Sequence, residues 1–319
     1  MDQNRGICWV VCDEGKVGTE NQCRGLAEAL GFDPVIKRIR PRFPWSHLPP
    51  QLWFQPLAGL DPETQLTPPW PNLIIAAGRV SVAPTIEIRR RSQGTTKLVH
   101  LQNPRVNPCH FDAVIAPAHD QLKGPGVIET RGALHRVTQE RLMEEAQKFA
   151  ATVAHLPRPL VTVLIGGDNS CYTYTPAALE ELAKALRHLC HAHGAGLAIT
   201  CSRRTDPQHA ATLRALIQDL PHVFWEGEGE NPYFGYLGLA DAIVVTSDSV
   251  NMNSEACFTG KPVYTFHLPG GSKKFRRFHD SFVKYGYTRP FKGLLEHWSY
   301  EPLDEREAVL EALKKRLSL

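Results

Sequence analysis

The sequence predicts an α/β protein with two doubly wound domains that face one another across a cleft. Short apolar, β-branched runs recur along the 319 residues, and a polar turn and a helical pattern follow most of them. Such alternation is typical of parallel strands that are buried on both faces. Pro157 and Pro159 mark a linker between two series of runs, and the chain is long enough for two domains of about 150 residues.

The composition is ordinary for a globular α/β protein, with 42% hydrophobic and 22% charged residues. A net charge of +3 is too small to predict a nucleic-acid partner. No apolar run approaches the roughly 18 residues of a membrane span, and the run at residues 7–12 is too short for a signal-peptide core. Eight cysteines without paired metal-ligand spacings predict a reducing, cytoplasmic setting.

The first series begins with a strand over residues 7–12 that ends at Asp13. Thr19 and Gln22 form a capping box, which predicts a helix from about residue 20 to residue 30. The loop before this helix contains Gly and Lys but lacks the G-x-x-x-x-G-K-S/T spacing of a nucleotide P-loop. We therefore expect only that the start of the helix could hold some polar group.

Residues 40–71 interrupt the series with nine prolines and three tryptophans. This composition fits an irregular excursion better than a helix. Packing is the expected role of its aromatic side chains, and covering a cleft or touching a membrane are the alternatives.

Polar residues recur directly after the later apolar runs of the first half. Because the carboxyl ends of parallel strands share one edge of a sheet, these residues are expected to line a crevice where ligands bind. They are Arg79, Gln102, Asn103, Arg105, His119, Asp120 and Arg131. A helix from about Thr138 to His155 is expected to close this half.

The second series opens with a strand that ends in two glycines. Gly166 and Gly167 follow the apolar residues 161–165, and Asn169 comes close behind. Since glycine has no Cβ, its backbone N–H can approach a diphosphate closely. This turn is therefore predicted to bind phosphate.

A helix capped by Thr175, with Pro176 at its first position, is expected to reach His193 and stop at Gly194. Its histidine- and cysteine-rich end, RHLCHAHG, suggests a metal site at first sight. Cations in a last helical turn also favour the helix dipole, and that explanation is preferred here to a metal.

The next two strands end in residues suited to a nucleotide. Ser202, Arg203 and Arg204 close the first of them. Two adjacent arginines at the carboxyl end of a strand are poorly explained by packing and suit phosphate clamps. Beyond the second strand, Glu228, Asn231 and Tyr233 could read the edge of a nucleobase or hold a sugar, with an ordinary loop as the alternative.

The stretch from residue 246 to residue 266 organises the second half. Ser247, Asp248 and Ser249 follow an apolar strand and open a short helix that carries Glu255. Free backbone N–H groups and small hydroxyls at a helix start predict a phosphate site, with Glu255 placed for a ribose diol. An ordinary capped βαβ turn is the alternative. No D-x-D pair is present for a divalent metal, so arginine and helix N-termini would have to meet the phosphate charge.

Several stretches spread over the chain carry a resemblance to a known family. They include GKVGTENQCRGLAEALG, AAGR, LQNPR, FDAVIAPAHD, TRGALHRVT, LIGGDN, CSRRT, EGEGENPYFGYLGLADAIVVTSDSVNMNSEA and KFRRFHDSFVKYG. Together they resemble the mitochondrial-fission family of the elongated-mitochondria type, from residue 8 to about residue 293. That family in turn resembles GT-B glycosyltransferases and UDP-sugar 2-epimerases. The resemblance implies a GT-B-like pair of Rossmann-like domains, the second of which binds a nucleotide-diphosphate sugar.

By this resemblance, Gly166 and Gly167 match the diphosphate loop and Glu255 matches the ribose-binding glutamate. Asn231 and Tyr233 would lie near the base.

The loop from residue 13 to residue 22 matches the region that takes the acceptor and often supplies a base. It contains no histidine, so the base would have to be Asp13 or Glu20. The residues expected on the acceptor side are Lys16, Gly18, Asn21, Gln22, Arg79, Gln102 and Arg131.

The expected domains are residues 1–156 for the acceptor, residues 157–300 for the nucleotide sugar, and a helix at 301–319 that returns to the first domain. The apolar stripe of that helix is Val309, Leu310, Leu313 and Leu317.

The favoured function is metal-independent sugar transfer from a UDP-type donor, with no separate cofactor. The alternatives are a non-catalytic adaptor, as the family's role in recruiting fission machinery implies, and a nucleotide-sugar epimerase. A lipid-linked or membrane-surface acceptor and a peripheral position at the inner membrane are left open. The sequence does not fix the oligomeric state.

Overall fold

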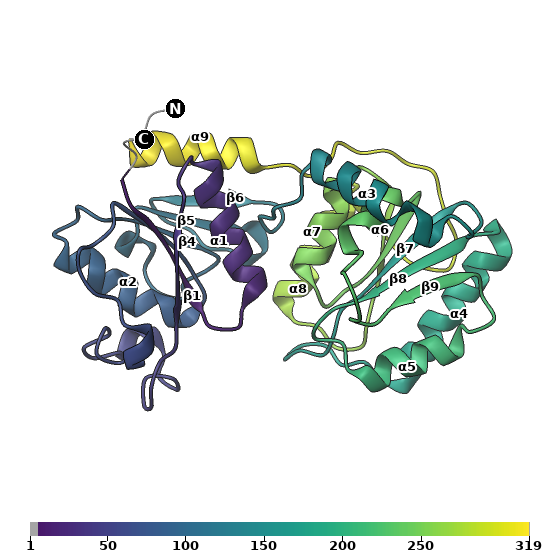
Figure 1. Cartoon of the computed structure of the whole chain (residues 1–319), viewed down its shortest axis with the longest axis horizontal. Coiled ribbons are helices and arrows are strands. Elements are labelled where there is room, and N and C mark those ends of the chain that lie inside the picture. The colour runs from purple at the N-terminus through teal and green to yellow at the C-terminus, as the bar shows by residue number, and fades with distance from the viewer. Residues whose placement is uncertain (1–5, 319) are drawn as a thin grey trace. The chain divides into compact units, whose positions relative to one another are not determined.

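The computed structural model describes residues 6–318, which form two compact units (Figure 1). Unit 1 comprises Met1–Arg136 and Glu305–Leu319, and unit 2 comprises Val137–Asp304. Each unit has one six-stranded parallel sheet with helices on both faces, so the predicted α/β class with two doubly wound sheets is confirmed. Within the described residues, no helix is both long and apolar enough to cross a membrane.

The strands of unit 1 are arranged in the order β2-β1-β3-β4-β5-β6. The chain starts inside the sheet, adds β2 on one side and then builds outward on the other, which is the doubly wound pattern. The strands are β1 (Cys8–Asp13), β2 (Val35–Ile39), β3 (Leu73–Ala77), β4 (Lys97–Leu101), β5 (Ala113–Pro117) and β6 (Val127–Thr130).

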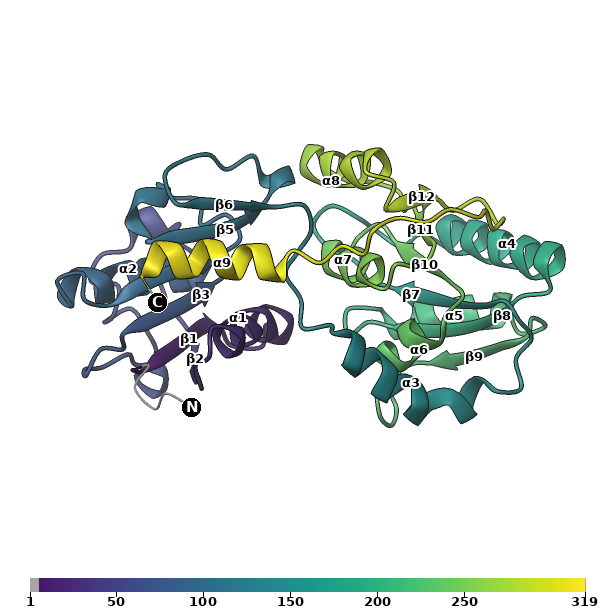
Figure 2. The same ribbon diagram turned by 90° about the horizontal axis from the view of Figure 1, so that it is seen from above.

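Helices α1 (Val17–Ala29) and α9 (Arg306–Leu317) pack on one face of this sheet, where Figure 2 shows them side by side. Helix α2 (Arg79–Arg91) and the proline-rich excursion pack on the other face. Trp53 and Leu60 of the excursion are buried, so packing is confirmed as a role of this segment. Short 3-10 turns complete the unit: η1 (Pro50–Leu52), η2 (Pro62–Thr64), η3 (Pro108–His110) and η4 (Ala118–Asp120).

The C-terminal helix α9 returns to unit 1, as predicted. Val309, Leu313 and Leu317 are buried, and Leu310 packs partly buried beside them.

The first helix begins earlier than predicted. The carbonyl of Lys16 already accepts a hydrogen bond from the N–H of Glu20 at 3.0 Å, so α1 starts at Val17. Lys16 is the N-cap residue and makes no side-chain cap. The capping box predicted at Thr19 and Gln22 is therefore wrong, because both residues lie inside the helix.

The strands of unit 2 are arranged in the order β12-β11-β10-β7-β8-β9. The strands are β7 (Leu160–Ile165), β8 (Gly196–Cys201), β9 (His222–Trp225), β10 (Ala242–Thr246), β11 (Val263–Phe266) and β12 (Thr288–Pro290). All residues of β7 and β10 are buried, because helices cover both faces.

One face of this sheet packs against α4 and α5, and the other packs against α3, α6, α7 and α8. The helices are α3 (Gln139–Val153), α4 (Pro176–His193), α5 (Pro207–Leu216), α6 (Tyr233–Leu239), α7 (Val250–Phe258) and α8 (Lys273–Lys284).

Helix α3 belongs to unit 2, so the structure places the boundary after Arg136, where sequence analysis placed it after residue 156. Helix α3 packs closely on α6 because two glycines of α6 face it. A Cβ on Gly238 would lie 2.5 Å from the carbonyl oxygen of Leu142, and one on Gly235 would lie 2.7 Å from the ring of Phe149. The α3–α6 contact joins segments that are far apart in the sequence, so no local pattern indicated that α3 belongs to unit 2.

The Gly238→Ala substitution is expected to destabilise unit 2 by about 1–3 kcal/mol, because the added methyl group must push α3 away from α6. Urea denaturation measures the loss. Ala151→Val, at an exposed position of α3, is the control and is expected to cost less than about 0.5 kcal/mol. Equal losses in the two variants would contradict this account of the contact.

Candidate functional site

Unit 2 has a pocket of about 260 Å³ at the carboxyl ends of β8 and β9. Five of the predicted nucleotide-binding residues line it: Ser202, Arg203, Asn231, Tyr233 and Glu255. They come from the turn after β8, the loop after β9, and helices α6 and α7. The structure thus brings together residues that are far apart in the sequence, as expected of one sheet edge.

Seven further lining residues were not predicted: Thr200, Cys201, Trp225, Glu226, Gly227, Phe234 and Met252. Trp225 is the last residue of β9, and its indole N–H donates to the carbonyl of Glu228 at 2.6 Å. The position of Trp225 at the carboxyl end of a strand was the sequence signal that could have identified it as a pocket residue. Aromatic rings of this kind offer a flat apolar surface to a planar ligand.

Glu255 carries the most perturbed carboxylate of the pocket. Tyr233 donates its hydroxyl to Oε2 of Glu255 at 2.6 Å. Burial raises the pKa of Glu255 to about 7, although the Tyr233 hydroxyl and the Arg141 guanidinium favour its charged form. Burial and the neighbouring carboxylate also raise the pKa of Tyr233, so the phenol remains the donor. A carboxylate held in this way can accept hydrogen bonds from a ligand diol.

The two adjacent arginines have different roles. Arg203 is exposed at the pocket and makes no hydrogen bond or ion pair with any residue that the structure describes. Arg204 donates to Asp248 Oδ2 at 2.8 Å and to the carbonyl of Gly167 at 2.8 Å. Only Arg203 is therefore available to a ligand without breaking an internal contact.

Asp248 is the anion that occupies the Gly-Gly turn in this structure. Its side chain is fully buried, and Oδ2 accepts from the N–H of Gly167 at 3.0 Å. Thr246 and Tyr174 donate their hydroxyls to Oδ1 at 2.7 and 3.2 Å. These three donors are therefore occupied by Asp248, and a phosphate could bind them only if the Asp248 side chain moved away.

The glycines of this turn are required by the internal network. A Cβ on Gly166 would lie 2.1 Å from a carboxylate oxygen of Asp248, and one on Gly167 would lie 2.1 Å from the carbonyl oxygen of Arg204. Sequence analysis assigned these two glycines to a diphosphate. The close approach of the Asp248 carboxylate and the Arg204 backbone explains why glycine stands at both positions.

Three other predicted phosphate ligands have structural partners. Ser249 caps α7 by accepting from the N–H of Met252, and Ser247 accepts from the N–H of Leu268. Asn169 Oδ1 accepts two backbone N–H groups of its own loop, and its amide donates to the Asp248 carbonyl. These side chains shape the sheet edge.

In unit 1 the two candidate bases differ in their surroundings. Glu20 forms a two-pronged ion pair with Arg38 at 2.7 and 2.8 Å, and the guanidinium lowers the pKa of Glu20. Asp13 pairs with Lys16 at 3.0 Å through Oδ2, while its buried Oδ1 makes no hydrogen bond with a described residue. Of the two candidates, Asp13 keeps a carboxylate oxygen without a partner among the described residues, whereas the Glu20 ion pair holds β2 against α1.

The predicted acceptor-side residues do not all come together. Gln22 and Gln102 contact each other at 3.4 Å. Arg79 instead donates to the carbonyls of Ser46 and Leu48 and so fastens the excursion. The backbone of Arg131 binds Glu305 just before α9. Gly18 and Asn21 are exposed in the first turns of α1.

The described residues contain no group of three or more His, Cys, Asp or Glu side chains that could hold a metal ion. The histidine-rich end of α4 has a structural role, since His193 accepts from the N–H of Leu295 at 3.0 Å. Gly194 ends the helix in the left-handed conformation, and Thr175 caps its start, as predicted.

Two parallel sheets with ligand-type residues at a carboxyl edge define a protein of the GT-B-like class. The chain is similar to a putative UDP-N-acetylglucosamine 2-epimerase from Listeria monocytogenes, with a TM-score of 0.59, 12% identity, and coverage of 98% of this chain and 97% of that one. It is also similar to a Neisseria meningitidis UDP-GlcNAc 2-epimerase bound to UDP-GlcNAc, with a TM-score of 0.51, 13% identity, and coverage of 97% and 99%. At these identities the similarity establishes the fold.

Residues 17–317 match the family described as Mitochondrial fission ELM1, and the chain belongs to that family. It is 32% identical over 275 residues to the mitochondrial fission protein ELM1 of Arabidopsis thaliana. The match covers 78% of this chain and 64% of the plant protein, so this chain spans less than two thirds of that relative. The family predicted from sequence motifs is confirmed.

The adjacent arginines provide a matched test of the Asp248 network. Arg204→Ala removes a charged donor from a buried carboxylate and is expected to cost about 2 kcal/mol of stability. Arg203→Ala is expected to change stability by less than about 0.5 kcal/mol. Thermal and urea unfolding measure both, and a larger loss in the Arg203 variant would refute the assignment.

Proposed function

We propose that unit 2 binds a nucleotide-diphosphate sugar of the UDP type and that the protein transfers the sugar without a metal. The observation that carries the proposal is the unit 2 pocket, which combines an unpaired Arg203 with the Tyr233–Glu255 pair. The fold supports it, since proteins named as UDP-GlcNAc 2-epimerases share it.

Each part of the ligand has a chemically suitable partner in the pocket. The Glu255 carboxylate accepts hydrogen bonds from the ribose diol, and Asn231 hydrogen-bonds the edge of the base. Trp225 and Phe234 offer aromatic surface to that base. Arg203 pairs with the diphosphate and offsets part of its negative charge.

In the proposed reaction, the bond between the sugar and the diphosphate breaks and a bond from the sugar to an acceptor hydroxyl forms. The leaving diphosphate keeps the bonding electron pair, and Arg203 stabilises the charge that develops there. The hydroxyl proton goes to a general base, and unit 1 offers Asp13 as the candidate, because its Oδ1 makes no hydrogen bond with a described residue.

A non-catalytic adaptor is the second candidate, and the ion pair that commits Glu20 to Arg38 favours it. The relative's name as a mitochondrial fission protein also supports it. A nucleotide-sugar epimerase is the third candidate, supported by the names of the similar structures.

A thermal-shift screen with nucleotide diphosphates and their sugars tests the binding step. A ligand at about 100 times its dissociation constant adds about 2.7 kcal/mol of stability. NMR of the products then separates the candidates. Transfer consumes an acceptor, epimerisation inverts the sugar without one, and binding without turnover favours the adaptor.

Arg203→Ala is expected to weaken UDP-sugar binding by more than about 1.5 kcal/mol, the free energy of a charge-assisted hydrogen bond. Titration calorimetry measures the affinity. Lys184→Ala, which removes an exposed cation from α4, is the control and should bind like the parent protein. Unchanged affinity in the Arg203 variant would remove this residue from the site.

Affinity for a UDP-sugar is expected to rise with pH, because the carboxylate form of Glu255 accepts both diol hydrogen bonds. With the pKa of Glu255 at about 7, the rise from about pH 6 to about pH 8 is roughly tenfold at most. The sugar's diphosphate diester stays ionised in this range. Glu255→Gln should bind more weakly and show a flat profile, whereas a parallel rise in that variant would exclude Glu255 as the titrating group.

A further inference from the structure

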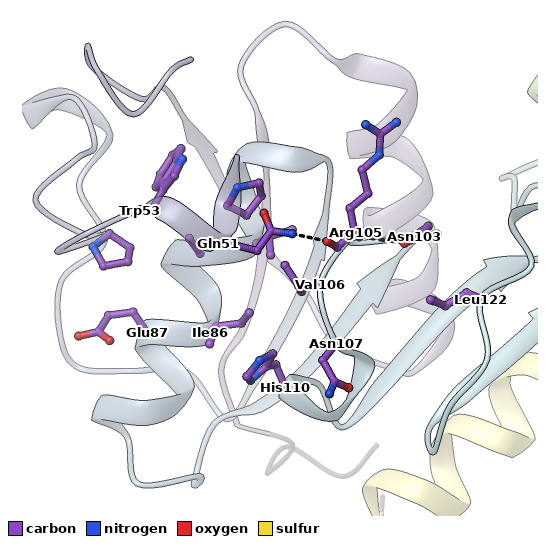
Figure 3. Close-up of a pocket in the computed structure, with 14 residues that line it drawn as sticks. Gln51, Trp53, Ile86, Glu87, Asn103, Arg105, Val106, Asn107, His110 and Leu122 are labelled. Atoms are coloured by element: carbon purple, nitrogen blue, oxygen red, sulfur yellow. Dashed lines mark hydrogen bonds between the residues drawn. The ribbon is translucent and has the colours of Figure 1, made fainter. Parts of the chain in front are cut away.

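Unit 1 contains a pocket of about 760 Å³ that the proposed function does not use (Figure 3). It lies between the excursion at residues 50–56, one side of α2, and the loop that follows β4. Its volume is in the range of small-molecule sites, which is about 300–1,000 Å³. We call it the excursion pocket.

The walls of the excursion pocket are mainly apolar. Trp53 and Pro50 come from the excursion, Ala83 and Ile86 from α2, and Leu122 from the loop before β6. Trp53 and Ala83 are almost fully buried within the unit, so this wall is part of the folded core and not a surface detail. Such a wall favours an apolar chain, at about 0.8 kcal/mol for each buried methylene group.

Arg105 is the one lysine or arginine among the described residues that line the pocket. The backbone of Arg105 has a φ of 58° and is held on both sides: its N–H donates to Asn103 at 2.8 Å, and its carbonyl accepts from the Gln51 amide at 2.5 Å. Its side chain is exposed, makes no hydrogen bond or ion pair with a described residue, and extends away from the other lining side chains in Figure 3.

The carboxylate among the lining residues does not cancel this charge. Glu87 is bound by Arg90 and Arg91 at 2.8 Å, and these guanidinium groups lower the pKa of Glu87 to about 2. The pocket therefore has an apolar interior and a positive rim.

Large apolar side chains are exposed on the same excursion. Phe43 is 80% exposed, Leu52 is 61% exposed and Phe54 is 56% exposed. Leu52 lies between Gln51 and Trp53, which both line the pocket, and the Phe54 ring packs against Trp45 at 4.7 Å. Exposed apolar groups beside a pocket indicate a surface that meets a lipid bilayer or another apolar partner.

We propose that the excursion pocket binds one anionic membrane lipid. The apolar chain lies along Trp53, Ala83 and Ile86, and the phosphate of the head group pairs with Arg105. Phe43, Leu52 and Phe54 enter the bilayer interface. The positive rim distinguishes this ligand from a neutral lipid. All lining residues belong to unit 1, so the proposal does not rest on nucleotide binding in unit 2.

Vesicle flotation tests the proposal with the full chain. The parent protein is expected to bind phosphatidylcholine vesicles that contain about 30% phosphatidylglycerol. It should bind vesicles of pure phosphatidylcholine at least fivefold more weakly, because each cation at an anionic surface contributes about 1 kcal/mol of binding free energy. Arg105→Glu should reduce binding to the anionic vesicles by at least about fivefold. Lys315→Glu changes the net charge equally but lies on α9, on the opposite face of the unit 1 sheet, and should bind like the parent.

Two further variants examine the interior. Ala83→Phe fills the pocket, and Ile86→Glu places a charge on its partly exposed wall; each should reduce vesicle binding while unfolding curves show a folded protein. Equal losses of vesicle binding in Arg105→Glu and Lys315→Glu would show that only the net charge matters, and this result would overturn the proposal. Full vesicle binding by both interior variants would also overturn it. Calorimetry with monomeric dodecyl phosphate separates the sources, because binding of this free amphiphile without any vesicle binding would exclude a membrane lipid.

Discussion

The buried carboxylate of Asp248 is the constraint on which the ligand-facing edge of unit 2 depends. A carboxylate removed from water is costly unless several donors surround it. Gly167 and Tyr174 supply donors from the loop after β7, and Arg204 supplies one from the turn after β8. Thr246 at the end of β10 supplies the fourth. The convergence of these four donors on one side chain fixes the turns after β7, β8 and β10 relative to one another.

This arrangement has a consequence for the neighbouring pocket. Because Arg204 is committed to Asp248, the adjacent Arg203 is left without an internal anion and supplies the pocket with an unpaired positive charge. The Tyr233–Glu255 pair supplies an acceptor in the same pocket. In the proposed function, the positive group pairs with the phosphates of a nucleotide and the half-buried carboxylate accepts from its ribose.

The local capping signals of α4 agree with the structure. Thr175 caps α4 and Gly194 ends it, since capping depends on a few neighbouring residues. Arg203, Asn231 and Glu255 share a pocket because parallel strands carry their following loops to one edge. Local pattern failed at the start of α1, where a backbone hydrogen bond to Lys16 begins the helix before the apparent cap.

The order of apolar runs and turns was enough to predict the α/β class and the two sheets, because alternating strands and helices permit few arrangements. The family was predicted from the resemblance of particular stretches to a known family. The order of the elements did not predict which charged side chains pair with one another. Glu20 meets Arg38 from a neighbouring strand, and Asp248 takes the N–H of Gly167 that a diphosphate was expected to occupy. A charge binds the nearest opposite charge or donor in space, and only the folded chain brings these partners, distant in sequence, within hydrogen-bonding distance.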